Sequence, residues 1–237
     1  MRLIYFAFCF FMYFLSSIPL LWIQKRHLKR GKPEKIDAFL EKKVKKWGRF
    51  TCKIAGINLT VEGLENQPDE PAVYIANHQS NFDIPVILST LKARVSILAK
   101  PSLEKIPLFS SWMALLHCEF ISRTDKRKTL KALMNCAKHI QDGYSLLIFP
   151  EGTRSRNGTV GKFKDGAFSI VGKTRVPIVP ICIEGTYNVF EAHGRKKIKP
   201  SDVTLKYLKP ILTVDLSKEE IASLSDEVRN LIIENKG

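Results

Sequence analysis

The chain has 237 residues, a formal net charge of +15 and a pI near 9.6. This length fits one large α/β domain with a small additional element, and the charge predicts an anionic partner: a nucleic acid, a membrane surface or a phosphorylated substrate. The five cysteines are scattered, odd in number and without CxxC spacing. They argue against a disulfide framework or a metal knuckle and indicate reduced thiols in a body that faces the cytosol.

Residues 3–23 carry no charge and are rich in Phe, Leu, Ile and Tyr. A helix of this length measures about 31 Å, close to the hydrocarbon thickness of a bilayer. No small-residue cleavage site follows, which disfavours a signal peptide. A basic cluster over residues 24–32 follows the apolar run, whereas only Arg2 precedes it. The positive-inside bias therefore predicts an inner-membrane protein whose body lies on the cytoplasmic side. Pro19 is expected to kink the helix, so shallow insertion into one leaflet stays open.

A second helix is predicted from apolar residues that recur at helical spacing opposite a basic face. The apolar residues are Ile36, Phe39, Leu40, Val44, Trp47 and Ile54. Such a helix suits an anionic membrane surface, where each basic residue contributes on the order of 1 kcal/mol. The alternative is an ordinary helix that packs on the core with solvated lysines. We expect residues 1–54 to attach the protein to a membrane with anionic lipid, and residues 55–237 to form an α/β domain. No nucleic-acid partner is expected, because no stacking platform or recognition motif accompanies the lysines.

The remaining chain alternates between predicted strands and helices. Strands are expected at 59–61, 72–76, 95–99, 119–121, 146–149, 178–183 and 203–207. Helices are expected through Pro85 to about Leu91, at 108–116, from Thr124 or Asp125 to near Gly143, at 168–173 and from Ser217 onward. This alternation predicts an α/β fold with a mostly parallel sheet flanked by helices.

The strand at 72–76 is followed by His78, four residues and Asp83. Open α/β sheets bind ligands at the carboxyl ends of their strands. Residues five apart on one helix differ by about 140° and do not face each other. We therefore expect His78 in the turn and Asp83 in the first turn of the next helix, where its carboxylate can orient the imidazole as a general base. The alternative is a helix-capping aspartate beside a surface histidine.

A second cluster, Glu151-Gly152-Thr153-Arg154, also follows a predicted buried strand. Gly152 allows a tight turn or a close approach to a ligand, and the planar fork of Arg154 suits a phosphate. Glu151 is expected either to orient a substrate hydroxyl or to hold the arginine. Further cations near strand ends are Lys100, Lys105 and Arg123. Taken singly, each of these is an ordinary surface charge.

Four blocks together resemble the glycerolipid acyltransferases in order and separation, over about residues 55–190. They are Asn77-His78-x4-Asp83, Phe120-Ile121-Ser122-Arg123, Phe149–Ser155 and Val176-Pro177-Ile178-Val179-Pro180. The N-terminal helical pair is also similar to the family, and the chain most resembles bacterial 1-acyl-glycerol-3-phosphate acyltransferases. One departure follows Ile106-Pro107-x-Phe109, where the family usually has a glycine and this chain has Ser110 and Ser111.

The resemblance implies that His78 removes a proton from the free hydroxyl of lysophosphatidic acid while Asp83 holds the ring. The oxygen then attacks the thioester of acyl-CoA or acyl carrier protein and gives phosphatidic acid. Arg154, helped by Lys100, Lys105 or Arg123, is expected to bind the acceptor phosphate. By the same resemblance, Asn77, Glu151, Gly152 and Thr153 complete the substrate-binding site. No metal or other cofactor is expected.

Other functions stay open at this point. The acceptor could be glycerol-3-phosphate, another lysophospholipid or an acylated amino-acid lipid. From a different class, the protein could be a non-enzymatic membrane protein that gathers anionic lipids, and a nucleic-acid binder comes third. Acyl chain length, the choice of donor and the oligomeric state are not encoded in any motif, since a chain-measuring tunnel arises only from tertiary packing.

Overall fold

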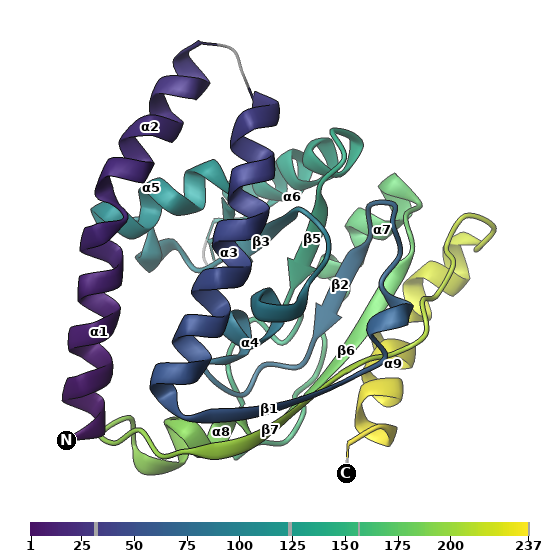
Figure 1. The fold of residues 1–237 in the computed structure, drawn as a ribbon. Helices are drawn as coiled ribbons and strands as arrows, with labels where there is room; N and C mark the ends of the chain where they lie inside the picture. Colours follow the sequence, from purple (N-terminus) through teal and green to yellow (C-terminus); the bar gives the residue numbers. More distant parts are fainter. Residues whose placement is uncertain (31–32, 123–124, 156, 237) are drawn as a thin grey trace.

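A computed structural model describes residues 1–30, 33–122, 125–155 and 157–236 (Figure 1). The N-terminal segment forms α1 (Arg2–Ser16) and α2 (Ile18–Lys29), which follow one another as a single helix that is bent around Ser17. Pro19 lies in the first turn of α2, where its missing N–H needs no helical partner. The expected kink is therefore present. Helix α3 (Pro33–Ala55) runs back alongside this pair (Figure 1).

The strands of the described chain form one mixed sheet in the order β1-β7-β6-β2-β5-β3-β4. They span β1 (Ile57–Glu62), β2 (Val73–Ala76), β3 (Val95–Ala99), β4 (Glu119–Phe120), β5 (Ser145–Ile148), β6 (Ile178–Glu184) and β7 (Ser201–Tyr207). Strands β6 and β7 pair antiparallel, and the other strand pairs are parallel. The mostly parallel α/β sheet predicted from the sequence is confirmed. As a result β2, β5 and β6 all end at the same edge of the sheet.

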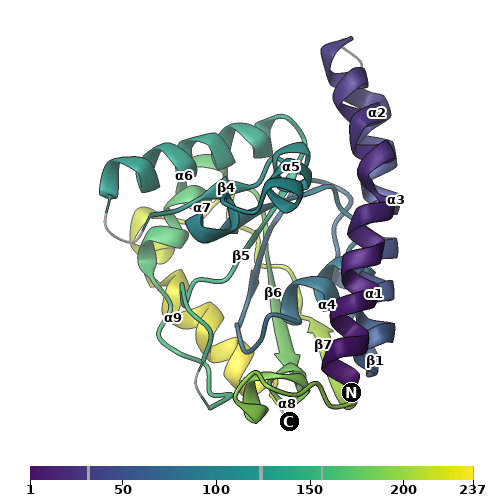
Figure 2. The same ribbon diagram turned by 90° about the vertical axis from the view of Figure 1, so that its left-hand side faces the viewer.

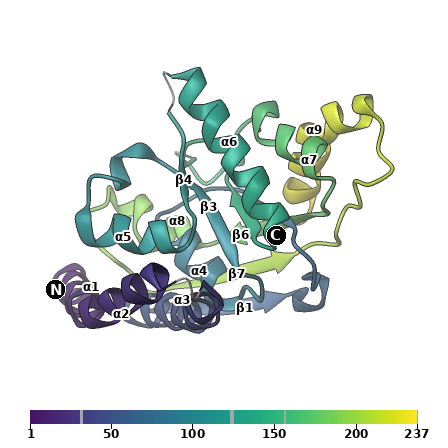
Figure 3. The same ribbon diagram turned by 90° about the horizontal axis from the view of Figure 1, so that it is seen from above.

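Helices cover both faces of this sheet (Figures 2 and 3). The further helices are α4 (Asp83–Thr90), α5 (Pro107–Leu115), α6 (Lys126–Gln141), α7 (Ser169–Thr174), α8 (Thr186–Val189) and α9 (Lys218–Glu234). Alternate residues of β2 belong to opposite cores: Val73 and Ile75 pack towards one face, and Tyr74 and Ala76 towards the other. A strand buried on both faces reads as a continuous apolar run, as the sequence of β2 does.

The apolar face of α3 packs on protein. Ile36 and Leu40 are buried in a cluster with Leu21 and Leu115. A Cβ atom placed on Gly48 would lie 2.6 Å from the backbone oxygen of Pro85, so the absence of a side chain lets α3 approach α4 closely. The prediction that this apolar face meets a membrane is wrong. The alternative, an amphipathic helix packed on the core, describes α3.

The outer face of α1 and α2 carries the exposed apolar residues that α3 lacks. They are Ile4, Tyr5, Phe8, Phe11, Met12, Leu15, Ile18, Trp22 and Ile23. Residues Arg2–Lys29 are long and apolar enough to cross a membrane. The inner face touches the body, because the rings of Phe6 and Phe82 lie 5.4 Å apart and Trp112 Nε1 donates to Ser17 Oγ at 3.1 Å. The exposed apolar surface indicates membrane association.

Candidate active site

The loop after β2 brings His78 and Asp83 into direct contact. Helix α4 begins at Asp83, as the five-residue spacing predicted, and His78 Nδ1 lies 2.7 Å from Asp83 Oδ2. The same oxygen accepts the backbone N–H groups of Gln79, at 2.7 Å, and Ser80, at 2.8 Å. Asp83 is fully buried. Because the carboxylate accepts at Nδ1, the Nδ1 atom carries the proton and Nε2 presents its lone pair as a base.

Thr186 supplies a fourth donor to this carboxylate. Its Oγ1 donates to Asp83 Oδ1 at 2.5 Å, and its side chain is fully buried. Four donors therefore converge on one buried anion, which stabilises the ionised carboxylate. Sequence reasoning did not single out Thr186. A signal existed, because Thr186 follows the end of β6 just as His78 follows the end of β2.

The imidazole is also held from the side. Its ring stacks on Phe149, the residue after β5, with ring centroids 4.2 Å apart and an interplanar angle of 29°. The side chain of His78 keeps 18% of its surface exposed. Packing on one side and the bond to Asp83 fix the orientation of the ring, while its remaining surface faces the cleft that it lines.

Glu151 fixes the backbone of His78 and does not hold the arginine. Its Oε1 accepts the backbone N–H of His78 at 2.7 Å, and its Oε2 accepts that of Gly161 at 2.9 Å. Burial raises the pKa of the Glu151 carboxyl, and these two N–H bonds oppose that rise. The interpretation that Glu151 pairs with Arg154 is wrong, because both of its carboxylate oxygens accept backbone N–H groups, one from His78 and one from Gly161.

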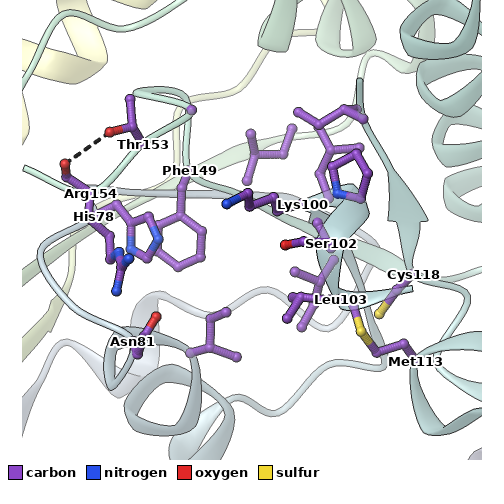
Figure 4. Close-up of a pocket in the computed structure, with 18 of the residues that line it drawn as sticks. His78, Asn81, Lys100, Ser102, Leu103, Met113, Cys118, Phe149, Thr153 and Arg154 are labelled. Atoms are coloured by element: carbon purple, nitrogen blue, oxygen red, sulfur yellow. Dashed lines mark hydrogen bonds between the residues drawn. The ribbon is translucent and has the colours of Figure 1, made fainter. Parts of the chain in front are cut away.

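Arg154 pairs instead with Glu191. Its Nη1 lies 2.8 Å from Glu191 Oε1, and its side chain is 29% exposed. The neighbouring Ser155 donates its backbone N–H to the carbonyl oxygen of His78 at 2.8 Å, so this segment lies against the histidine loop. Arg154 and His78 line the same cleft, where Thr153 also lies (Figure 4). Sequence reasoning did not identify Glu191, and no local pattern marks it.

The other predicted residues differ in whether they line the cleft. Gly152 has a φ of 66°, so it makes the tight turn expected of it and lines the cleft. Lys100 is exposed and lines the cleft (Figure 4). Lys105 is exposed but is not part of the cleft wall. Asn77 is buried and exchanges hydrogen bonds of 2.9 and 2.8 Å with the backbone of Ile183, which ties β2 to β6. Arg123 lies outside the described residues.

The cleft has a volume of about 1600 Å³, and its wall contains both cationic and apolar side chains. The cations that line it are Lys43, Lys100, Lys126, Arg154, Lys164 and Arg195. Its apolar wall combines the N-terminal helices with the α/β body through Tyr13, Phe14, Val44, Trp47, Leu88, Phe109, Trp112 and Met113. In Figure 4, His78 and Arg154 lie on one side and Met113 and Cys118 on the other. The shape and polarity fit an amphipathic molecule with an anionic head.

Comparison with known proteins identifies the family of this chain. The sequence model of the acyltransferase family matches residues 58–184. The chain is 38% identical over 177 residues to the chloroplastic 1-acyl-sn-glycerol-3-phosphate acyltransferase BAT2 of Brassica napus, covering 74% of this chain and 50% of that protein. It is 31% identical over 158 residues to a probable 1-acyl-sn-glycerol-3-phosphate acyltransferase of Mycoplasma pneumoniae, and the match covers 65% of this chain and 59% of that protein.

A solved structure matches over the whole chain. The crystal structure of the 1-acyl-sn-glycerophosphate (LPA) acyltransferase PlsC from Thermotoga maritima superposes with a TM-score of 0.82 at 30% identity, and covers 100% of this chain and 96% of that one. The chain spans about half the length of the two plant chloroplast relatives that it resembles. On the sequence match across residues 58–184 and on this shared fold, the chain belongs to the acyltransferase family.

Proposed function

We propose that the protein transfers a fatty acyl group from an acyl thioester to the free hydroxyl of lysophosphatidic acid, giving phosphatidic acid. One observation carries the proposal: His78, paired with Asp83, lines a cleft whose wall contains both cationic and apolar side chains. The names of the curated relatives and of the solved structure support the same reaction.

The chemistry follows from the hydrogen bonds of the dyad. His78 Nε2 takes the proton of the acceptor hydroxyl as the oxygen attacks the thioester carbonyl. Asp83, whose charge is held by four donors, stabilises the imidazolium that forms. The tetrahedral intermediate then collapses, its C–S bond breaks, and the imidazolium returns the proton to the departing thiolate. The acceptor supplies the nucleophile, so the protein needs no serine or cysteine in that role.

Recognition of the acceptor falls to the cations beside the dyad. The guanidinium of Arg154 has five N–H donors, and one of its nitrogens bonds Glu191, so donors remain for a phosphate. Lys100 lines the same cleft. Of the three predicted helper cations, Lys100 is the one whose described position suits this task. The apolar wall takes a fatty acyl chain, which removes its methylene groups from water at about 0.8 kcal/mol each.

Residues 1–54 attach the enzyme to a membrane in this proposal, and residues 55–237 carry the catalytic residues. The N-terminal helix touches the body near both of its ends: Phe6 contacts Phe82, and Lys25 Nζ donates to Ser111 Oγ at 3.3 Å. A helix that crossed the bilayer would separate at least one of these two contacts from the body. We therefore favour insertion of its outer face into one leaflet, on the cytoplasmic side of the inner membrane, where basic residues meet anionic lipid.

A labelled acyl-transfer assay tests the proposal. The full chain in detergent is given acyl-CoA or acyl carrier protein as donor, with lysophosphatidic acid, glycerol-3-phosphate or a lysophospholipid without a terminal phosphate as acceptor. We expect acylation of lysophosphatidic acid, and a loss of at least about a hundredfold in His78→Ala with lipid binding retained. No acylation by the wild type, or a His78→Ala protein as active as the wild type, refutes the enzyme and favours a lipid-binding module.

A further inference from the structure

Glu191 connects two parts of the site that lie far apart in the sequence. Its carboxylate accepts Arg154 Nη1 at 2.8 Å and the backbone N–H of Asn81 at 3.2 Å, both on Oε1. The other oxygen, Oε2, accepts a short hydrogen bond from Ser80 Oγ. Ser80 and Asn81 belong to the loop between His78 and Asp83. One carboxylate therefore joins the catalytic loop to the arginine.

This carboxylate is built into the protein and is not a solvated surface charge. The side chain of Glu191 is 9% exposed, and Ser80 is fully buried. Glu191 lies in a short 3-10 turn, Glu191–His193, that follows α8, the helix that also provides Thr186. The same segment thus orients Asp83 through Thr186 and Arg154 through Glu191.

We propose that Glu191 is a positioning residue that sets the separation between the Arg154 guanidinium and the His78 imidazole, and so selects which hydroxyl of a phosphate-bearing acceptor is acylated. The inference rests on the proposed function, in which Arg154 binds the phosphate. In lysophosphatidic acid, the reacting hydroxyl sits on the carbon next to the one that carries the phosphate. In glycerol-3-phosphate, the primary hydroxyl is one carbon farther away. A fixed distance from guanidinium to imidazole distinguishes the two.

Arginine alone does not fix that distance. Its side chain is long, and an unpaired arginine samples many rotamers, so ordering it costs conformational entropy. The ion pair with Glu191 selects one arrangement before the acceptor arrives, which removes that cost from binding. The opposite view treats Glu191 as a competitor that neutralises Arg154 and weakens phosphate binding. It predicts that removal of Glu191 tightens binding, so the two views differ in sign.

The experiment compares Glu191→Ala and Glu191→Gln with the wild type, using the full chain in detergent, one donor, and lysophosphatidic acid and glycerol-3-phosphate as acceptors. We expect Glu191→Ala to lower kcat/KM for lysophosphatidic acid about tenfold to hundredfold, chiefly through KM, because a hydrogen bond to a charged group is lost. The ratio of kcat/KM for lysophosphatidic acid to that for glycerol-3-phosphate should fall. Glu191→Gln keeps the shape and one acceptor oxygen, so it should restore part of both values.

Glu227→Ala is the matched control, since it removes an exposed carboxylate on α9 that is not part of the cleft wall. Its kinetics should match the wild type. An equal loss for both acceptors, or tighter lysophosphatidic acid binding by Glu191→Ala, overturns the inference. If the wild type acylates no lysophosphatidic acid, the proposed function fails separately. The Kd of lysophosphatidic acid, measured by titration, then decides: a weaker affinity in Glu191→Ala supports positioning, and an equal affinity overturns it.

Discussion

Replacing Asp83 by asparagine tests the dyad with the smallest change of shape. The amide oxygen can occupy the position of Oδ2 and still accept the N–H groups of Gln79, Ser80 and the imidazole. The amide nitrogen then faces Thr186, whose hydroxyl can turn to accept. Asp83→Ala would instead leave these buried donors without a partner, at about 1–3 kcal/mol each. That loss approaches the whole stability of a domain, so asparagine is the informative substitution.

The magnitude follows from the charge that is lost. Hydrogen bonds to a charged group contribute about 1.5–3 kcal/mol and neutral ones about 0.5–1.5 kcal/mol, so four bonds lose roughly 4 kcal/mol together. Relief of a buried charge offsets part of that loss. The protein should stay folded with a lower Tm. Catalysis loses the anion that stabilises the imidazolium, which should lower kcat by about 10²–10⁴-fold, or about 2.7–5.5 kcal/mol of activation free energy.

The assay measures labelled phosphatidic acid at saturating donor and acceptor, with thermal unfolding of the same samples. We expect a large fall in kcat and a small change in the KM for lysophosphatidic acid, because Asp83 is buried and does not touch the acceptor site. A folded Asp83→Asn protein that retains more than about a tenth of the wild-type kcat contradicts the role assigned to the dyad.

Three further predictions concern other parts of the molecule. Arg154→Ala should raise the KM for lysophosphatidic acid at least about tenfold in steady-state kinetics, and the KM of Arg154→Lys should lie between those of Arg154→Ala and the wild type. An unchanged KM in Arg154→Ala would show that Arg154 does not bind the phosphate. Gly48→Ala should lower the free energy of unfolding by about 1–3 kcal/mol in denaturant unfolding, because its Cβ would lie within 2.9 Å of three backbone atoms. Gly172→Ala is the control and should be neutral, because its Cβ would meet only the side chain of Ile221, at 3.5 Å. Burial raises the pKa of the Cys118 thiol to about 12, so the native state keeps a proton that the unfolded chain loses near pH 8.5. Burial raises the pKa values of the Cys52, Cys136 and Cys182 thiols in the same way. Stability should therefore fall between those pH values in both proteins, but less steeply in Cys118→Ala than in wild type, by up to about 1.4 kcal/mol per pH unit in chemical-denaturant unfolding.

The sequence predicts the fold well because its signals are local. Continuous apolar runs such as Val73–Ala76 identify strands buried on both faces, and alternation with helices implies the parallel sheet. Helix starts are also local: Asp125, one of the two predicted caps, caps α6, and α9 begins after Ser217 as predicted, with a capping box. The dyad could be predicted for the same reason, since the spacing of His78 and Asp83 at a strand end limits where each can lie.

Contacts between distant segments could not be predicted. Glu191 lies 110 residues from Asn81 in the chain and 37 from Arg154, and only the folded sheet brings the three together. Glu151 shows the same limit in another way. Its position three residues before Arg154 left open whether it would hold the arginine or orient a substrate hydroxyl, yet Glu151 turns inward to the His78 backbone. Helix α3 has an amphipathic pattern that does not distinguish a membrane from the protein's own core.

The N-terminal helices line the same cleft as His78 and also carry the exposed apolar surface. Tyr13 and Trp47 line the same cleft as His78. In the proposed function, the wall that shelters an acyl chain is therefore made by the segment that meets the membrane. A separate tether would place the membrane at an arbitrary distance from the dyad. Because α1 packs on α3 and α3 packs on α4, the membrane-facing surface is rigidly linked to the helix that begins at Asp83. If the proposed function holds, a lipid acceptor keeps its tail in an apolar environment while its hydroxyl reaches the imidazole.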